Sequence, residues 1–425
     1  MIGAARRIAA AWVLPIDGPP LPNGAVLITD DGRLTALGPD RDVPTPPGVP
    51  VERLADAALL PGLINTHTHL ELTGFDGLVP ETRFPEWIRR IIALKAARTP
   101  AEYLAAARQG VRDCWAGGMT TVADTGDSGS VIQALAELGG SGIAYHEVFG
   151  PHPGQAAAAM DQATRRLAEL EPFTGPRIRL GISPHAPYSV SGDLYARVAA
   201  LAAERALPVA IHLAESEDES LLLELATGGF AAAWQGRGIP LPPLPGCSPV
   251  EWLERHGVLG PRTLCIHVVR AGSRDLETLA RRGAAIAHCP RSNRRHGHGA
   301  APLAQMLARG LRVGIGTDSV ASVTPLDLFA EARMAREHAG LDAEAALRLA
   351  TLEGARALGL ESEVGSLAPG KWGDVIAVGL PEAVDASRLA GTLLSRVHND
   401  VRLTLLGGRE VFRASRAGVS ISQGA

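Results

Sequence analysis

The feature that most constrains the fold is an alternation of short apolar runs with longer helix-like segments through the middle of the chain. Eight such runs occur, and each resembles a buried β-strand followed by an amphipathic stretch. They begin in the Leu60–Leu72 stretch and continue at 120–124, 142–149, 177–185, 208–215, 263–268, 284–290 and 312–318. Repeated strand–helix units imply a parallel sheet, and eight of them predict a closed (β/α)8 TIM barrel of the α/β class. An open doubly wound sheet is the alternative, but no Gly-x-Gly-x-x-Gly turn follows any run.

The two ends of the chain have a different pattern. Residues 25–38 contain two β-type runs joined by Asp-Asp-Gly-Arg, which is a hairpin signal. From Gly365 onward, short strand-like segments alternate with turns. Together the two ends predict a small β-sandwich domain built from both chain termini. We expect this composite domain at 1–58 and 363–425, and the barrel at 59–362.

Composition and charge exclude several classes of function. A chain of 425 residues, 46% of them hydrophobic, can bury a large core. Its formal net charge of −4 gives no basis for binding nucleic acid. No apolar run approaches the ~20 residues of a membrane-spanning helix, and Pro15 and Asp17 follow the short N-terminal apolar run where a signal peptide would have its cleavage site. We therefore expect a cytoplasmic protein with a small-molecule substrate, no nucleic acid and no membrane contact; the sequence leaves room for a homodimer.

The four cysteines have neither metal-binding nor redox spacing. Cys114, Cys247, Cys265 and Cys289 are scattered without a Cys-x-x-Cys pair, and three of them lie in apolar surroundings. Buried free thiols are therefore expected in place of disulfides or a cysteine metal site.

The first predicted strand ends in a His-Thr-His triplet. Side chains two residues apart on a strand point to the same face, so His67 and His69 project together, as two ligands of one metal ion would. A single pair of this kind is weak evidence, because two such histidines are more often ordinary surface or core residues. The other strands decide how much it means.

Further histidines and acidic residues lie at the C-terminal ends of the predicted strands, where barrel enzymes carry their chemistry. Each alone is more often structural, but their common placement at one end of the barrel is hard to explain by packing. They are His185, His212, Glu215, His267, His288 and Asp318. Three histidines and one carboxylate suit a single divalent ion, Zn²⁺ first, with Fe²⁺ or Mn²⁺ as alternatives.

Five short motifs follow one another along the chain. They are Pro-Gly-Leu-Ile-Asn-Thr-His-Thr-His (61–69), Ser-Pro-His-Ala-Pro-Tyr-Ser (183–189), His-Leu-Ala-Glu-Ser (212–216), His-Cys-Pro-Arg-Ser-Asn (288–293) and Gly-Thr-Asp-Ser (316–319). In composition and order they resemble the amidohydrolase superfamily, specifically its cytosine/adenosine deaminase and chlorohydrolase branch. The resemblance spans nearly the whole chain. It implies a metal-dependent hydrolase acting on C–N bonds other than peptide bonds, as a cyclic amidine deaminase does.

The resemblance also assigns roles to individual residues. Glu215 takes the role of proton shuttle. His267 orients the attacking water and, with Asp318, helps to deprotonate it, while His185 faces the substrate. The implied metal ligands are His67, His69, His212 and Asp318.

Lysine usage argues against the two-metal members of the superfamily, whose ions are bridged by a carboxylated lysine on strand 4. The only lysines in this chain are Lys95, in the first helical region, and Lys371, beyond the predicted barrel. A lysine-bridged binuclear site is therefore not expected.

Three segments resemble deaminases of 6-amino-6-deoxyfutalosine, an adenine nucleoside of menaquinone biosynthesis: His-Thr-His-Leu-Glu-Leu, Phe-Pro-Glu-Trp-Ile-Arg and Gly-Thr-Asp-Ser-Val-Ala-Ser. Within them, Glu71, Trp87 and Ser319 are further candidate substrate contacts. A surface carboxylate fits Glu71 equally well, and a core residue on a helix face is favoured for Trp87. The alternatives are an S-adenosylhomocysteine, adenosine or guanine-type deaminase, a triazine-type chlorohydrolase or amidase, and a non-catalytic scaffold. The scaffold is disfavoured, because all four implied ligands, Glu215 and His267 are present.

Two loops complete the predictions. A solvated basic loop is favoured for Arg294 and Arg295, over contact with a substrate carboxylate. For His296 and His298 a flexible, glycine-rich lid is favoured over additional metal binding. The proline-rich insertion at 236–249 is a candidate cover for the pocket.

Overall fold

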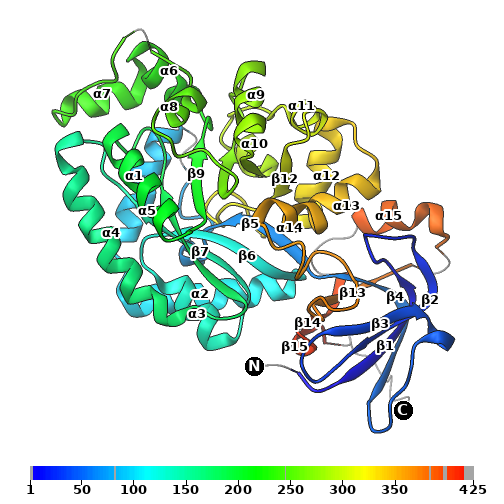
Figure 1. Cartoon of the computed structure of the whole chain (residues 1–425). Helices are drawn as coiled ribbons and strands as arrows, with labels where there is room; N and C mark the ends of the chain where they lie inside the picture. Colours follow the sequence, from blue (N-terminus) through cyan, green and yellow to red (C-terminus); the bar gives the residue numbers. More distant parts are fainter. Residues whose placement is uncertain (1–2, 81–82, 245, 382–383, 396–399, 416–425) are drawn as a thin grey trace, which may run out of the picture.

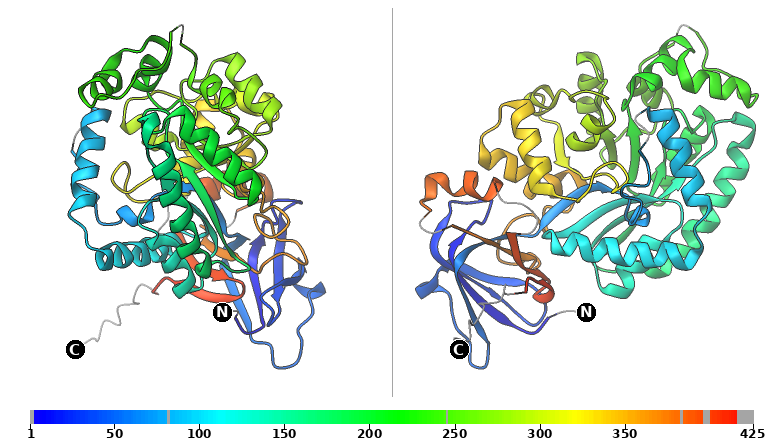
Figure 2. Two further views of the ribbon diagram at one scale, coloured as in Figure 1. Left: turned by 60° about the vertical axis from the view of Figure 1, so that its left-hand side comes forward. Right: turned by 180° about the vertical axis from the view of Figure 1, so that it is seen from behind.

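The computed structural model describes residues 3–80, 83–244, 246–381, 384–395 and 400–415. It contains a barrel surrounded by helices and a smaller β-domain beside it, and the first and the last described strands both belong to the smaller domain (Figure 1). The two further views show the same separation (Figure 2).

Eight strands form the barrel sheet, in the order β12-β11-β10-β9-β8-β7-β6-β5, and the pairs between neighbours are parallel. Their bounds are β5 (Leu63–Thr68), β6 (Met119–Gly126), β7 (Gly142–Val148), β8 (Ile178–Pro184), β9 (Val209–Leu213), β10 (Thr263–His267), β11 (Ala285–His288) and β12 (Arg312–Ile315). A parallel bridge between Thr68 and Asp318 brings the two edges together. The predicted TIM barrel is confirmed, and each predicted strand overlaps an observed one.

Helices cover the outside of the barrel, as the strand–helix alternation predicts. Half of the ten helices that lie between the strands begin at a residue whose side chain caps the helix, and Thr99 and Glu102, for example, form a capping box at the start of α2. The helices that follow or separate the strands are α2 (Pro100–Ala116), α3 (Ser130–Leu138), α4 (Ala156–Leu170), α5 (Gly192–Glu204), α8 (Pro249–Arg255), α9 (Ser273–Arg282), α11 (Leu303–Ala308), α12 (Leu328–Ala339), α13 (Ala343–Leu349) and α14 (Leu352–Leu358). Additional helices in the loops are α1 (Phe84–Ala96), α6 (Glu217–Leu225), α7 (Gly228–Gly236) and α10 (Pro290–Arg295), and a short 3-10 turn (Leu70–Leu72) follows β5.

The smaller domain is built from both ends of the chain. Its seven strands form one sheet, in the order β15-β14-β13-β4-β1-β2-β3. They are β1 (Arg6–Val13), β2 (Leu21–Ile28), β3 (Leu34–Pro39), β4 (Val51–Pro61), β13 (Val375–Gly379), β14 (Val401–Leu406) and β15 (Arg409–Arg413), and α15 (Ala386–Leu394) lies in the segment between β13 and β14. The predicted hairpin is the antiparallel pair β2–β3. The predicted division into 1–58 with 363–425 and 59–362 stays a prediction.

Gly62 joins the two domains, because β4 ends at Pro61 and β5 begins at Leu63. A Cβ atom at Gly62 would lie 2.1 Å from Oγ1 of Thr120 on β6. Only glycine fits this close approach of two strands, and the first barrel strand follows the small domain without a loop.

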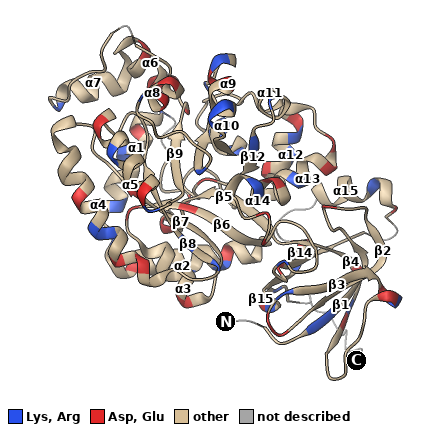
Figure 3. Cartoon of the chain, in the orientation of Figure 1, with Lys and Arg blue, Asp and Glu red and all other residues tan. Residues whose placement is uncertain are grey.

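The distribution of charged residues and the state of the cysteines match what the sequence predicts. Basic and acidic residues are interspersed along the outer helices (Figure 3). All four cysteines are buried and free, as predicted. Among the described helices, none is both long and apolar enough to cross a membrane.

Candidate metal centre and catalytic site

The ends of β5 and β12 bring two histidines and one aspartate together. The backbone N–H groups of Thr317 and Asp318 donate to the carbonyl of His67 at 3.0 and 3.1 Å, which fixes the chain after β12 onto β5. As a result, Oδ1 of Asp318 lies 3.5 Å from Nε2 of both His67 and His69. Asp318 itself has a φ of 57°, a left-handed backbone conformation in which aspartate is tolerated better than most residues.

Backbone carbonyls orient two of the imidazole rings. Nδ1 of His69 lies 2.8 Å from the carbonyl of Thr125, and Nδ1 of His212 lies 3.2 Å from the carbonyl of His185. A carbonyl oxygen can only accept, so in each ring Nδ1 carries the proton. The lone pair of each ring is therefore on Nε2, the arrangement in which a protein presents histidine to a metal ion.

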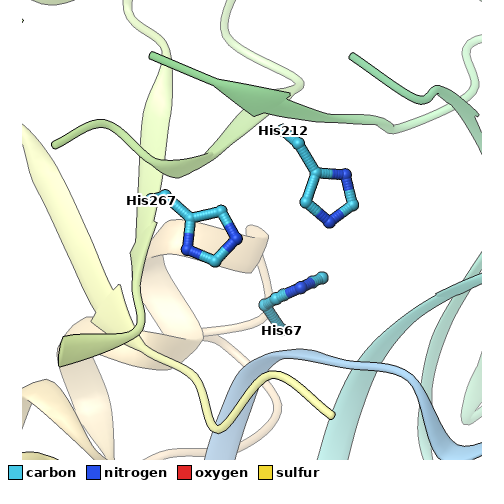
Figure 4. A group of neighbouring side chains, drawn as sticks. All are labelled: His67, His212 and His267. Atoms are coloured by element: carbon cyan, nitrogen blue, oxygen red, sulfur yellow. The ribbon is translucent and has the colours of Figure 1, made fainter. Parts of the chain in front are cut away.

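Three overlapping groups of side chains offer ligand atoms within 4.8 Å of one another. The groups are His67–His212–His267, His67–His69–Asp318 and His69–Glu147–His212. In Figure 4 the rings of the first group reach one space from β5, β9 and β10. The four ligands implied by the sequence are thus gathered at one point, with His267 and Glu147 beside them.

The donor set fits a divalent cation. Both ring nitrogens of His67 are buried and have no hydrogen-bond partner among the described residues. Burial lowers the pKa of His67 to about 4, and burial also holds the pKa of His212 well below its usual range, so both rings are neutral near pH 7. An unpaired buried ring nitrogen is costly unless a ligand binds it, and three imidazoles with one carboxylate are the ligands that zinc prefers.

Two hydroxyl groups hold the second oxygen of Asp318. Ser292 Oγ donates to Oδ2 at 2.5 Å, and Ser322 Oγ donates to the same atom at 3.1 Å. Burial would raise the pKa of Asp318, but the contact with His67 and the field of the neighbouring rings hold it well below its usual range. The carboxylate is therefore ionised, with Oδ1 directed at the two histidines of β5.

Glu215 is a second buried carboxylate next to the candidate centre, and it faces two imidazole rings. Its Oε1 is 3.6 Å from Nε2 of His267 and 3.4 Å from Nε2 of His298. Burial would raise the pKa of Glu215, but the two rings outweigh it and lower the pKa to about 2. Nδ1 of His267 lies 2.9 Å from the amide oxygen Oδ1 of Asn293, which fixes the ring.

The profile of the amidohydrolase family matches residues 58–411. The chain belongs to this family. A 5-methylthioadenosine/S-adenosylhomocysteine deaminase of Symbiobacterium thermophilum is 30% identical over 429 residues, covering 95% of this chain and 93% of that protein. A 5'-deoxyadenosine deaminase of Methanothermobacter thermautotrophicus is 32% identical over 339 residues, covering 75% and 72%.

Solved structures of deaminases are also similar to this chain. A zinc-bound adenosine deaminase from Xanthomonas campestris has a TM-score of 0.80 and 26% identity, over 96% of this chain and 93% of that one. The aminofutalosine deaminase of Helicobacter pylori has a TM-score of 0.85 over 96% and 100%, and at 22% identity it shows the fold alone. Family membership and deaminase relatives together support a hydrolytic deaminase acting on C–N bonds, with a divalent metal ion in the His/Asp cluster.

The lysines of this amidohydrolase lie away from the barrel strands. Lys95 is on α1 and pairs with Glu71 at 2.7 Å and with Asp127 at 2.6 Å. Lys371 contacts the hydroxyl of Ser366 at 2.7 Å. Strand β8, the fourth of the barrel, contains no lysine, so no residue there can form the carboxylated bridge of the two-metal members.

Two of the predicted substrate contacts border the metal centre. The ring centroid of His185 lies 4.8 Å from that of His212, and its Nδ1 contacts the hydroxyl of Ser189 at 2.7 Å. Ser319 directly follows Asp318 and is buried, with its hydroxyl 3.3 Å from that of Ser322. Their roles toward substrate stay predictions.

Glu71 and Trp87 have other partners in the structure. Glu71 is buried, and besides Lys95 it accepts a 2.5 Å hydrogen bond from Ser128 Oγ. Trp87 lies on α1, stacked on Phe84 at 5.9 Å and edge-on to His296 at 4.7 Å. A substrate role for either residue therefore requires a ligand that reaches past these contacts, and it stays a prediction.

The loop after β11 differs from its prediction. Arg294 and Arg295 are exposed, as expected of a solvated basic loop, but the rings of His296 and His298 are buried and contact the site. The expectation of a flexible lid is wrong for these two rings, because Phe84 and Trp87 pack on them. The 236–249 insertion also packs here: Ile239 and Leu241 join an aromatic cluster that is continuous with Phe84 and Tyr188.

Some functional residues were not predicted. Ser292 and Asn293 stand inside a quoted motif but gain their roles only by contact with residues 26 positions away. Glu147 is the penultimate residue of β7, and its buried Oε1 has no hydrogen-bond partner among the described residues. Its place near the end of a strand predicts a position beside His69 and His212, which the structure shows. His288, which was noted at such an end, is buried and lies outside the three ligand groups found in the described residues.

Proposed function

We propose that this amidohydrolase removes the 6-amino group of an adenine nucleoside by hydrolysis and releases ammonia. The observation that carries the proposal is the joint placement, in one site, of the His67–His69–His212–Asp318 donor set and an ionised carboxylate, Glu215, whose ion-pair partners are His267 and His298. The adenosine-type deaminases among the relatives support the substrate class.

The residues of the site divide the reaction between them. When bound, a divalent cation supplies Lewis-acid activation of the attacking water. Glu215, ionised at the start, accepts a proton from that water and delivers it to N1 of the purine. The ring of His267, fixed by Asn293, and the carboxylate of Asp318 orient the water.

Atoms balance in this scheme. The water oxygen bonds to C6, one of its protons reaches N1 through Glu215, and the second reaches the amino group, which leaves as ammonia. The product is the 6-oxopurine nucleoside. The buried rings and hydroxyls around the carboxylates exclude bulk water, which strengthens each of these contacts.

The finer substrate assignment rests on two kinds of likeness. The relatives in sequence favour adenosines altered at the 5′ position, such as 5′-deoxyadenosine, methylthioadenosine and S-adenosylhomocysteine. The three motifs around Glu71, Trp87 and Ser319 favour 6-amino-6-deoxyfutalosine, which would place the protein in menaquinone biosynthesis. Both belong to one class, an adenine nucleoside with an altered 5′ side. Zinc as the native ion, a cytoplasmic location and a homodimer stay predictions.

Ammonia release by the zinc-loaded protein tests the proposal. The panel contains aminodeoxyfutalosine, 5′-deoxyadenosine, methylthioadenosine, S-adenosylhomocysteine, adenosine, guanine, cytosine and a chlorotriazine. Turnover of at least one adenine nucleoside is expected, and the preferred one names the substrate. Chloride release from the chlorotriazine without ammonia release from any nucleoside would overturn the proposal in favour of a chlorohydrolase, and silence across the panel with metal bound would overturn it altogether.

A further inference from the structure

One oxygen of Glu215 lies between two imidazole rings. Oε1 faces Nε2 of His267 at 3.6 Å and Nε2 of His298 at 3.4 Å. The second ring comes from the loop after α10, which carries none of the metal ligands implied by the sequence. All three side chains are buried, so bulk water cannot replace either contact.

Hydrogen-bond chemistry distinguishes the two rings. His267 directs Nδ1 at the amide oxygen of Asn293, an acceptor, so Nδ1 carries the proton. Held at Nδ1, the ring turns Nε2 toward Glu215 at 3.6 Å, which is too long for a hydrogen bond. Nε2 of His298 lies 3.4 Å from Oε1, is buried and has no hydrogen-bond partner of standard geometry among the described residues, so it is the ring nitrogen available to donate to the carboxylate, which can only accept.

The fold holds His298 in this position from two sides. Its backbone N–H donates to the carbonyl of Asn293 at 2.9 Å, and it stands between Gly297 and Gly299, whose φ values of 69° and 104° turn the chain sharply. On the other face, Phe84 at the start of α1 packs edge-on against the ring with centroids 4.7 Å apart. The imidazole is thus clamped between α1 and the loop.

The same loop reaches the other two catalytic groups. Ser292 donates to Asp318, Asn293 holds His267, and Nε2 of His296 contacts Ser322, whose hydroxyl donates to Asp318. One short segment after β11 therefore touches every acid–base residue of the site. Such a concentration of contacts is typical of the outer residues that orient a catalytic centre.

We propose that His298 is a positioning residue that donates Nε2–H to Oε1 of Glu215 and keeps the proton shuttle ionised and aimed at the attacking water. The inference rests on the proposed function, because it assigns Glu215 the shuttle role. It predicts that loss of the donor slows the chemical step while substrate and metal still bind.

Three variants test this. His298→Ala removes the donor, and His298→Gln restores an N–H at nearly the same reach. His256→Gln is the control, because that ring packs on Trp252 at the end of α8 and contacts neither carboxylate in the described structure. Each is assayed with the nucleoside that the wild type turns over fastest, and zinc content and thermal midpoint are measured alongside.

For His298→Ala we expect kcat to fall about 10- to 100-fold, the effect of losing one hydrogen bond to a charged group. KM and zinc content should stay near wild type. The acid limb of kcat/KM should move to higher pH, since burial then acts on Glu215 with one donor fewer. His298→Gln should recover most of kcat. Other charged and titratable groups near Glu215 also affect its pKa, so they are left unchanged in all variants. They are His185, Tyr188, Glu219, His267, His296 and Asp318.

Unchanged kcat in His298→Ala would overturn the proposal, and so would a loss of activity in both variants that follows lost zinc or a lowered midpoint. A readout without turnover separates this from the fate of the proposed function. In protein labelled with ¹⁵N-histidine, Glu215→Gln should shift the ring nitrogens of His298 and leave those of His256 in place. If the wild type releases no ammonia but this shift appears, the proposed function is wrong and the contact between His298 and Glu215 is confirmed. If the shift is absent, the contact between His298 and Glu215 is refuted.

Discussion

Asp318 and Glu215 are both buried carboxylates at the metal centre, and both are ionised, but they are held by different chemical groups. Asp318 accepts two hydrogen bonds from serine hydroxyls on Oδ2 and directs Oδ1 at His67 and His69. Glu215 has no hydroxyl donor among the described side chains and faces two imidazoles with one oxygen.

The difference fits the roles proposed for the two residues, Asp318 as a metal ligand and Glu215 as the proton shuttle. A serine hydroxyl does not change charge between pH 4 and 10, so it fixes a carboxylate in one state and one orientation. An imidazole can lose or gain a proton within the physiological range and can respond when its carboxylate neighbour is protonated. Hydroxyls therefore suit the proposed role of Asp318 as a permanent ligand, and imidazoles suit Glu215, which in the proposed mechanism changes its protonation state in every turnover.

The largest effect should come from Glu215→Gln. The amide keeps the shape of the side chain but cannot accept and deliver a proton, so kcat should fall by about 10³-fold or more. Zinc content should equal that of the wild type, because Glu215 is outside the implied ligand set. Activity assays with metal analysis on the same sample check this, and undiminished turnover would refute the shuttle role.

Asp318→Asn is the matched change on the other carboxylate, and it should separate the two residues. The amide is a much poorer ligand for a divalent cation, so zinc content should fall and activity should fall with it. His212→Ala should behave in the same way, whereas His185→Ala should keep its metal and lose substrate affinity. Full zinc occupancy in Asp318→Asn, measured after dialysis against a weak chelator, would contradict the ligand assignment.

Ser292→Ala should have a smaller effect, confined to the Asp318 side. The variant removes the shorter of the two hydroxyl contacts but leaves Ser322 in place. Outer partners of metal ligands typically contribute 10- to 100-fold to metal affinity, so we expect a zinc affinity about 10-fold weaker. Activity at saturating zinc should be nearly restored. If excess zinc does not restore it, Ser292 acts on the reaction in another way.

The sequence predicts the ligand side of this comparison better than the acid–base side. His67 and His69 are two residues apart on a strand, and the remaining implied ligands stand at strand ends, so strand periodicity and the barrel rule are enough to gather them. The barrel and the terminal β-domain follow from the same periodicity. That β8 has no lysine can be read directly from the sequence once the strands are placed.

The partners of Glu215 are not accessible in that way. His298 lies in a glycine-rich loop, where composition suggests mobility, and only its packing against Phe84 on α1 shows that it is fixed. The sequence favours a surface carboxylate and a substrate contact equally for Glu71, whereas the structure places it, buried, beside Lys95 and Ser128. These contacts join segments that are far apart along the chain and are not related by a strand or helix repeat. No local sequence pattern therefore predicts them.

Glu219 supplies the last and smallest test, because it is a third buried carboxylate next to Glu215 with a different environment again. In the sequence it ends an acidic run that resembles an exposed helix start. In the structure it is fully buried and accepts from the backbone N–H groups of Ala214 and Glu215, at 2.9 Å each. These bonds do not outweigh burial, which raises the pKa of Glu219 to about 8.

A raised carboxyl pKa determines how the stability of the folded protein changes with pH. Between the unfolded value near 4.5 and the folded value near 8, the unfolded chain has lost the proton that the folded chain keeps, so the free energy of unfolding falls as the pH rises. Glu219→Gln removes this titration. Because its amide can accept only one of the two N–H bonds, the variant should be less stable than the wild type at pH 5. Between pH 5 and pH 7 its free energy of unfolding should rise by about 1–2 kcal/mol relative to that of the wild type. Urea midpoints at both pH values measure the trend, and a difference that stays constant with pH would show that Glu219 is ionised in the folded protein, as Asp318 and Glu215 are.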